Sequence, residues 1–455
     1  MSDLKSVNPA TGELIRDYDA MSEEEIQEVI AASQEAFLDW REVPYESKQE
    51  LMLKAACVLR EGSEEFATLL TQEMGKTIGS ARSEVEKCAW VCEFYARKAK
   101  DFLAPRMIET DASLSMVRYD PLGPILAVMP WNFPFWRVFR FAAPYLMAGN
   151  TGLLKHAANT QGSALAIEQI FERAGFPKNV FRTLLIGSSA VESVIRDERV
   201  RGVTLTGSER AGRAVAKAAG EALKPCVLEL GGSDPFIVFA DADLDAAVSG
   251  AITSRFLNNG QSCIAAKRFI VVKDVYEEFL SKFKAAILEM KMGDPMDDAV
   301  DIGPQAREDL REGLHEQVTK TLEQGGRLEC GGEIPDGEGF YYPPTLISGV
   351  KPGMEAFDEE VFGPVAPVIC ADDEEHAIAL ANQSDLGLGG SVWTASIQRA
   401  LEVVPRIESG HVSVNGIVKS DPRLPFGGIK DSGFGRELSE EGIKAFMNTK
   451  TVWIK

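Results

Sequence analysis

The sequence predicts an α/β fold with two doubly wound open α/β domains and a small β element. Between residues 123 and 239, short apolar runs alternate with helical segments; the runs are PILAVMPW, TGLLK, FRTLLIG, RGVTLTG, PCVLEL and PFIVF. Continuous apolar runs separated by helices indicate strands buried on both faces of a mainly parallel sheet. A second alternation begins near Asp243 and includes KRFIVV, APVICAD and GLGGSVW, which predicts a second domain of the same class.

The first hundred residues predict helices. Ser22 and Glu25 form a capping-box pattern, and the apolar residues from Ile26 to Phe37 then follow the period of one helical face. Residues 162–174 predict a further helix, which glycine and proline terminate. Residues 104–121 change character, because polar turn residues lie between two short segments that can pair as a hairpin.

Composition and charge exclude several classes of partner. The 455 residues include 48 Lys plus Arg against 69 Asp plus Glu, so the formal net charge is −21. Such a surface repels phosphate backbones, and we expect neither nucleic acid nor a membrane as a partner. The longest uncharged run, residues 121–136, is too short for a spanning helix and contains four prolines. The first residues show no targeting pattern, and the seven cysteines have no disulfide-framework spacing, so we expect a cytoplasmic protein.

Several familiar motifs fail. The glycines at 207 and 212 have P-loop spacing, but Arg213 and Ala214 follow where Lys and Ser or Thr are required. No G-x-G-x-x-G follows the first strand of the α/β region. Cys88 and Cys92 lie one helical turn apart without a histidine nearby, so we expect no metal site.

Two segments place reactive side chains where such folds build their sites. In VLELGGSDP, Glu229 ends an apolar run and two glycines follow; on this segment alone, a strand-end carboxylate paired with a cation is the simpler interpretation. In NNGQSCIAAKR, a polar turn presents Cys263 at the join between the two α/β halves. Most cysteines are buried apolar residues, but the polar flanks of Cys263 suit an accessible nucleophile.

Together with these two segments, PWNFPFW at 130–136, EEVFGPV at 359–365 and PFGGIKDSGFGRE at 425–437 resemble the NAD(P)-dependent aldehyde dehydrogenase superfamily. Their joint order is highly specific. The resemblance implies that Cys263 attacks an aldehyde carbon, that Asn132 and the Cys263 backbone N–H stabilise the oxyanion, and that Glu229 activates the water that hydrolyses the thioester. Residue patterns do not show what activates Cys263.

The resemblance also implies a dinucleotide site. Its residues are Trp131 and Ser208 for the pyrophosphate, Lys155 for the adenosine ribose, and Glu360 with Phe362 at the nicotinamide ribose. A helix N-terminus at Ser208 makes phosphate binding physically reasonable without a glycine fingerprint. Many NAD-preferring relatives carry a Glu three residues after the lysine, where this chain has Ala158. We therefore expect NADP as the preferred cofactor, with NAD possible.

The substrate expectation rests on Arg140. It lies eight residues after Asn132, where succinate-semialdehyde dehydrogenases carry an arginine that faces the substrate, although Arg137 is nearly one helical turn away and competes for the pocket. A guanidinium suits a distal carboxylate. Trp136, Ser262 and Ser420 match other positions of the substrate pocket.

Two departures refine the resemblance. One branch of succinate-semialdehyde dehydrogenases has a second carboxylate-binding arginine six residues before the catalytic cysteine, where this chain has Leu257. The chain therefore looks closer to a shorter bacterial branch with a single arginine, and we expect a lower carboxylate affinity or a broader specificity. Position 265 is Ala, so no Cys-x-Cys pair exists. Oxidation of other short ω-carboxy or aliphatic aldehydes is the alternative activity, and a catalytically silent structural or binding protein is the alternative of another class.

The resemblance implies three structural units. They are a cofactor-binding domain of residues 1–103 and 122–229, a catalytic domain of residues 230–427, and an oligomerisation element of residues 104–121 and 428–455. In the last, the hairpin and the final strand KTVWIK extend a sheet across a subunit boundary, which implies a homodimer or homotetramer.

Overall fold

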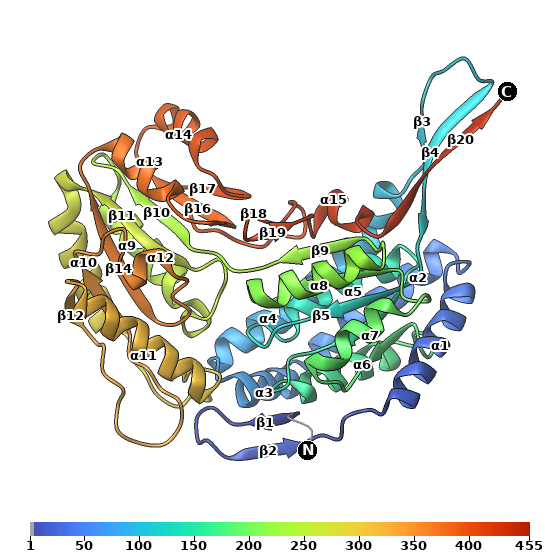
Figure 1. Cartoon of the computed structure of the whole chain (residues 1–455), viewed down its shortest axis with the longest axis horizontal. Helices are drawn as coiled ribbons and strands as arrows, with labels where there is room; N and C mark the ends of the chain where they lie inside the picture. Colours follow the sequence, from blue (N-terminus) through green and yellow to red (C-terminus); the bar gives the residue numbers. More distant parts are fainter. Residues whose placement is uncertain (1–3) are drawn as a thin grey trace.

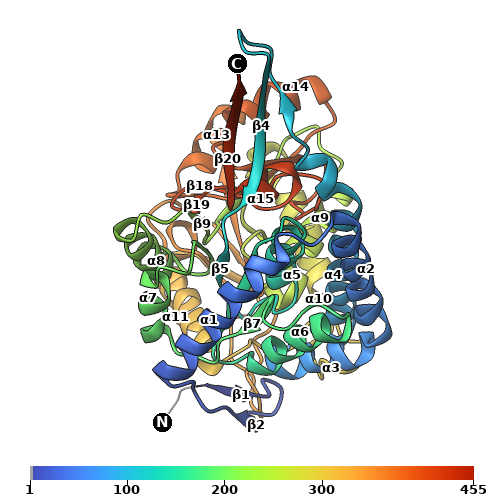
Figure 2. The ribbon, with the colours of Figure 1, turned by 90° about the vertical axis from the view of Figure 1, so that its right-hand side faces the viewer.

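The computed structural model describes residues 4–455. Two large sheets with helices on both faces lie side by side, and a thin ribbon of strands projects from one of them (Figure 1). Figure 2 shows that β4 and β20 of this ribbon extend beyond the helical layers when the molecule is turned. The predicted fold class is therefore confirmed.

The first sheet has the strand order β7-β6-β5-β8-β9-β19. Its strands are β5 (Pro124–Val128), β6 (Thr151–Lys155), β7 (Phe181–Thr183), β8 (Gly202–Thr206), β9 (Cys226–Glu229) and β19 (Gly433–Phe434). The first five pair in parallel, as the apolar runs predict. The chain order reverses between β5 and β8, and open α/β sheets bind ligands in the crevice beyond the carboxyl ends of such strands.

The helices of this half cover two apolar cores. They are α1 (Glu23–Trp40), α2 (Tyr45–Glu61), α3 (Ser63–Met74), α4 (Ile78–Phe102), α5 (Trp136–Met147), α6 (Gln161–Arg173), α7 (Val191–Arg196) and α8 (Glu209–Glu221). On β5, Ile125 and Ala127 pack toward α2 to α6, whereas Leu126 packs toward α1, α7 and α8. Because both faces are buried, the strand sequence is continuously apolar. The predicted capping box at Ser22 is confirmed.

The second sheet has the order β12-β13-β14-β11-β10-β16-β17. Its strands are β10 (Asp234–Val238), β11 (Ala266–Val272), β12 (Arg327–Cys330), β13 (Thr345–Ser348), β14 (Val365–Ala371), β16 (Gly389–Trp393) and β17 (His411–Val414). Its helices are α9 (Leu244–Phe256), α10 (Tyr276–Leu288), α11 (Glu308–Glu323), α12 (Glu355–Asp358), α13 (Glu374–Asn382) and α14 (Ile397–Val403). Four short 3₁₀ helices are η1 (Ser188–Ala190), η2 (Leu257–Gly260), η3 (Lys273–Val275) and η4 (Val404–Arg406). Only β12 runs antiparallel to its neighbour in this sheet.

The strands of the two sheets point opposite ends toward the site. Glu229 closes β9, and only a short Gly-containing turn separates it from the start of β10. Cys263 lies three residues before the start of β11. The first sheet therefore contributes strand carboxyl ends to the site, and the second contributes strand amino ends.

The projecting ribbon consists of β3 (Arg106–Met107), β4 (Leu114–Pro121) and β20 (Met447–Ile454). Strand β20 pairs antiparallel with β4 along its whole length, so the predicted hairpin and final strand are both present. The rest of the C-terminal segment differs from the expected boundary at residue 428. β18 (Ile429–Lys430) pairs with β15 (Leu386–Gly387), β19 pairs with β9, and α15 (Ser439–Lys444) follows. Two-residue strands carry no periodicity that a sequence could reveal.

The chain starts with a small separate sheet of β1 (Lys5–Val7) and β2 (Leu14–Asp17). Across residues 4–455, no helix combines the length and apolarity that a membrane crossing requires.

A glycine next to the cysteine turn offers a test of the fold. Gly260 has φ +74°, and a Cβ atom there would lie 2.3 Å from the backbone of Gly363. We expect Gly260→Ala to lower the free energy of unfolding by about 2 kcal/mol or more, because strain and a backbone clash coincide. The thermal unfolding midpoint measures this.

Gly313 on α11 is the matched control, since a Cβ there meets nothing within 4 Å. Gly313→Ala should keep or raise the unfolding midpoint, because alanine is the better helix former. Equal midpoints for Gly260→Ala and wild type would contradict the assigned constraint.

Candidate active site

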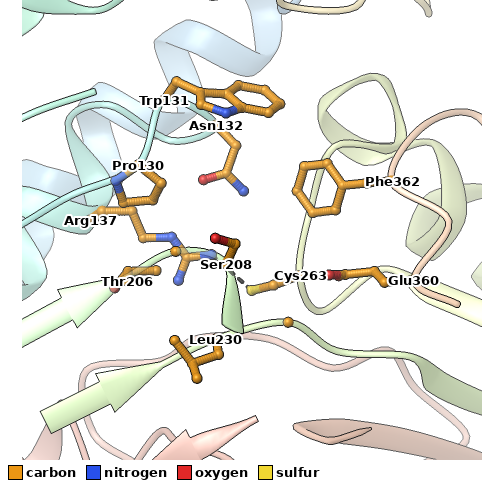
Figure 3. A pocket seen from close by; sticks show the side chains of 12 residues that line it. Pro130, Trp131, Asn132, Arg137, Thr206, Ser208, Leu230, Cys263, Glu360 and Phe362 are labelled. Atoms are coloured by element: carbon orange, nitrogen blue, oxygen red, sulfur yellow. Dashed lines mark hydrogen bonds between the residues drawn. The ribbon is translucent and has the colours of Figure 1, made fainter. Parts of the chain in front are cut away.

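A cavity of about 180 Å³ opens where β5 and β8 end, at the reversal of the first sheet. Twelve residues from both halves of the chain line it, and Figure 3 shows their side chains. They are Pro130, Trp131, Asn132, Arg137, Thr206, Gly207, Ser208, Leu230, Gly231, Cys263, Glu360 and Phe362. Six of the residues that the sequence singles out therefore meet in one cavity.

Cys263 faces this cavity with a cationic neighbour. The side chain is 7% exposed, and Nη2 of Arg137 donates a hydrogen bond of 2.9 Å to Sγ (Figure 3). A positive group beside a cysteine sulfur stabilises the negative charge that the sulfur carries as a nucleophile. Arg137 thus supplies the neighbour of Cys263 that the sequence did not reveal.

Two asparagines hold the turn before Cys263. Asn258 and Asn259 both have φ 58°, in the left-handed region that asparagine tolerates better than most residues. Nδ2 of Asn258 donates to the backbone oxygens of Asn132 (2.8 Å) and Gln261 (3.1 Å). Nδ2 of Asn259 donates to the backbone oxygens of Gly75 and Pro304. These bonds fix the cysteine turn to the first domain and to the loop before α11.

The Asn132 amide is placed for an oxyanion. Its Nδ2 donates to the Gln261 backbone oxygen at 3.1 Å, and its Oδ1 accepts from the Phe133 N–H at 3.1 Å. An amide nitrogen carries two hydrogens, so one donor is left for a ligand. Figure 3 shows this amide directed into the cavity.

A buried carboxylate positions the segment that carries Asn132 and Arg137. Oε1 of Glu84 accepts from the backbone N–H groups of Phe135 and Trp136, both at 2.9 Å, and Glu84 also pairs with the buried Lys76. A carboxylate is favourable at a helix N-terminus because backbone N–H groups are unpaired there. The sequence analysis missed Glu84, since nothing local links α4 to the start of α5.

Glu229 lies beside the cavity rather than on its wall. The residue is 1% exposed, and neither carboxylate oxygen has a hydrogen-bond partner among the described residues. Burial first, and then the nearby Glu437, raise the pKa of Glu229 well above its usual range, although Arg140 and Arg137 oppose the shift. A raised pKa of this kind is typical of a carboxyl group with a proton-transfer role.

The remaining wall of the first cavity has features that fit a dinucleotide. Ser208 caps the N-terminus of α8, and helix N-termini bind phosphate through free N–H groups. The rings of Trp131 and Phe362 meet edge to face at 5.8 Å. A Cβ on Gly231 would lie 2.6 Å from Oε2 of Glu360, so the glycine leaves space for this carboxylate in the position it occupies.

Glu360 also connects the dinucleotide wall to the cysteine turn. Its Oε1 lies 3.0 Å from Nζ of the buried Lys267, and Lys267 donates to the backbone oxygens of Ser262 and Cys263 at 2.9 and 2.7 Å. Sequence reasoning passed over Lys267. The sequence feature that could have indicated its role is its position four residues after Cys263, at the start of a buried strand.

Lys155 and Ala158 lie after β6, outside the lining of this cavity. Burial lowers the pKa of Lys155, and no acidic group contributes to that shift. No carboxylate stands at position 158.

A second cavity of about 490 Å³ lies on the other side of the cysteine turn. Ser262, Ser420 and Trp136 line it, and Nε1 of Trp136 donates to Oγ of Ser420 at 3.2 Å. Arg137 lines both cavities. Phe133 and Phe426 add aromatic walls.

Arg140 lines neither cavity. It is fully buried, it pairs with Glu437, and its guanidinium lies 4.6 Å from the centre of the Phe426 ring. Of the two candidate arginines, Arg137 rather than Arg140 therefore faces the cavities in this structure. The sequence could not show this, because Glu437 reaches Arg140 from a segment almost three hundred residues away along the chain.

Comparison with known proteins agrees with this geometry. The family model of the aldehyde dehydrogenase family matches residues 1–452. A Synechocystis sp. protein named probable succinate-semialdehyde dehydrogenase [NADP(+)] is 51% identical over 99% of both chains. The succinate-semialdehyde dehydrogenase [NADP(+)] of Mycobacterium leprae is 47% identical over 99% of both chains. A crystal structure of succinic semialdehyde dehydrogenase from Streptococcus pyogenes in complex with NADP+ matches with a TM-score of 0.97 at 36% identity, covering 99% of both chains.

The contact between Arg137 and Cys263 predicts the reactivity of the thiol. We expect Arg137→Met to slow alkylation of Cys263 by iodoacetamide about tenfold or more, because a hydrogen bond to a charged group contributes about 1.5–3 kcal/mol. Mass spectrometry of the Cys263 peptide over time measures the rate. Arg173→Met, which removes an exposed arginine at the end of α6, should leave the rate unchanged. Equal rates in both variants would show that the contact does not assist the sulfur.

Proposed function

The chain belongs to the aldehyde dehydrogenase family, and from this premise we propose that it oxidises succinate semialdehyde to succinate with NADP+ as the preferred oxidant. The observation that carries the proposal is the position of the cysteine turn between two unlike cavities. Cys263 faces the cavity with dinucleotide-binding features, whereas Ser262 and Ile264 face the cavity whose walls include cations. An aldehyde with a distal anionic group fits this arrangement.

The covalent chemistry is assigned to Cys263, Asn132 and Arg137. The sulfur attacks the aldehyde carbon, with Arg137 stabilising its negative charge beforehand. The carbonyl oxygen becomes an oxyanion. It accepts one hydrogen bond from the Nδ2 group of Asn132 and another from the backbone N–H of Cys263. Removing one such donor typically costs about 10²–10³ in rate.

Glu229 is assigned the hydrolytic step. A nicotinamide cofactor bound here would supply the hydride acceptor that conversion of the tetrahedral adduct to a thioester requires. The Glu229 carboxylate then takes a proton from a water molecule, whose oxygen attacks the thioester carbon. Succinate leaves, and the sulfur recovers its negative charge beside Arg137.

The NADP preference is supported by position and charge. Ser208 at α8 and Trp131 would hold the pyrophosphate, Glu360 and Phe362 the nicotinamide ribose, and Lys155 the adenosine ribose. Ala158 has no carboxylate to repel a 2′-phosphate. The Mycobacterium and Synechocystis relatives carry NADP(+) in their names, which supports the same preference.

We also propose a homodimer or homotetramer in the cytoplasm. Exposed apolar side chains on the ribbon, among them Met107, Trp453 and Ile454, support an assembly through β4 and β20. All seven cysteines are free, as in proteins of a reducing compartment.

A matrix of kcat/KM values tests the activity. Succinate semialdehyde and butanal, which has the same carbon count without the carboxylate, are each assayed with NADP+ and NAD+. We expect the highest value for succinate semialdehyde with NADP+. Ala158→Glu should shift the preference toward NAD+ by about tenfold or more, since a carboxylate repels the 2′-phosphate; Ala299→Glu, in an exposed loop, should not.

Each other outcome overturns one part of the proposal. Comparable values for the two cofactors would reject the NADP preference. Equal efficiency with butanal would favour a broader aldehyde dehydrogenase, which the aromatic walls and Leu257 of the second cavity would accommodate. Absence of turnover in folded protein would favour a silent binding protein.

Replacement of Glu229 isolates the hydrolytic step. Glu229→Gln should release NADPH in one burst equal to the enzyme concentration and then turn over at least about 10²-fold more slowly. In the wild type, hydrolysis should accelerate as pH rises through neutrality, because the pKa of Glu229 is raised and only the ionised form is a base. Stopped-flow absorbance measures both. Glu323→Gln, exposed at the end of α11, should behave as wild type, and an undiminished steady rate in Glu229→Gln would reject the role.

A further inference from the structure

Lys87 is a cation without an anionic partner among the described residues in the wall of the second cavity. It lies on α4, is half-buried, and makes no hydrogen bond or ion pair with any residue of the described range 4–455. Its Nζ lies 4.2 Å from the centre of the Trp136 ring, and Trp136 lines the same cavity. Nothing in the sequence motifs pointed to this residue.

The charges around Lys87 do not neutralise it. The charged and titratable groups that face it from α4, from α5 and from the loop after β17 are Glu84, Cys88, Arg137, Arg140, Lys419 and Asp421. Both acids are already held, because Glu84 pairs with Lys76 and Asp421 lies 2.6 Å from Nη2 of Arg423. Burial first, and then Arg140 and Arg137, lower the pKa of Lys87 to about 8.

An unpaired cation in a largely apolar cavity is unfavourable unless a ligand compensates it. The cost is consistent with a binding role, since strained electrostatics of this kind cluster at functional sites. Eight of the seventeen other residues that line this cavity are aromatic or aliphatic, among them Trp90, Phe133 and Phe426, and its two acids are already paired. The missing element is therefore an anion.

The positions of the two cations separate their roles. Three carbon–carbon bonds of about 1.5 Å each join the aldehyde carbon of succinate semialdehyde to its carboxylate carbon. Arg137 touches the sulfur that attacks the aldehyde carbon, and Cys263 lines only the first cavity. Lys87 lines only the second cavity, which Arg137 lines as well.

We propose that Lys87 binds the distal carboxylate of the substrate and determines the preference for ω-carboxy aldehydes. In this role it takes the place of the second carboxylate-binding cation that position 257 lacks, since Leu257 lines the same cavity. The inference rests on the proposed function for the identity of the substrate, but the ammonium site itself does not depend on it.

The test compares Lys87→Met with wild type on succinate semialdehyde and on butanal, both with NADP+. Methionine keeps the length of the side chain and removes the charge. We expect KM for succinate semialdehyde to rise about tenfold or more with a smaller change in kcat, because a charge-assisted hydrogen bond is lost. KM for butanal should stay unchanged, and Lys87→Arg should restore most of the affinity.

Lys98→Met is the matched control, because Lys98 is an exposed lysine on the same helix. It should leave both substrates unaffected. An equal loss on both aldehydes in Lys87→Met would assign Lys87 a merely structural role and overturn the proposal. A loss in Lys419→Met without one in Lys87→Met would overturn it as well, since Lys419 is the other unpaired lysine of this wall among the described residues.

Two further readouts separate this inference from the proposed function. Calorimetry of succinate binding to the protein without NADP+ should show weaker binding in Lys87→Met than in wild type, whether or not the enzyme oxidises the semialdehyde. If wild type does not oxidise succinate semialdehyde but still loses succinate affinity in Lys87→Met, only the proposed function fails. Equal succinate affinity in both proteins would reject the carboxylate site.

The pH dependence gives the third readout. Lys87 is charged below its pKa of about 8 and neutral above it, so the wild-type KM for succinate semialdehyde should rise as pH passes that value. Lys87→Arg should remove this rise, because a guanidinium stays charged throughout. The same rise in Lys87→Arg and wild type would contradict the assignment.

Discussion

The buried carboxylate of Glu84 is the constraint on which the site depends. It joins α4 to the start of α5 through two backbone N–H groups and is itself neutralised by Lys76. The segment it holds carries Asn132 on one side and Arg137 on the other. Lys87 lies less than one helical turn after Glu84 on α4. The same contact therefore also fixes the positions of Asn132 and Arg137 relative to the proposed carboxylate site.

The acidity of the chain makes these local groups decisive. A net charge of −21 gives no general attraction for a dinucleotide phosphate or a carboxylate substrate. The structure resolves this by pairing the acids that lie near these groups with other cations. The acids near the second cavity are paired with Lys76 and Arg423, and Glu437 is paired with Arg140. Arg137 and Lys87 therefore remain as cations for ligands within an acidic protein.

Much of the fold was predictable because it depends on local patterns. Apolar runs such as PILAVMPW predicted strands buried on both faces, and β5 is one of them. The motif resemblance brought Cys263, Asn132 and Ser208 to one place before any geometry was known, and one cavity contains all three. What local pattern could not provide was pairing between distant segments. The choice between Arg137 and Arg140 depends on Glu437, and the short strand β19 joins β9 from the far end of the chain.

The two shifted pKa values give the site opposite requirements. Burial disfavours charge on both Glu229 and Lys87, so it raises the pKa of the carboxyl group and lowers that of the ammonium group. Glu229 must lose its proton to act as a base, whereas Lys87 must keep its proton to hold a carboxylate. Rising pH therefore favours hydrolysis while it weakens substrate binding. Desolvation of the two groups therefore confines the state in which both are charged to a limited range of pH. Below that range Glu229 is protonated and neutral, and above it Lys87 is deprotonated and neutral.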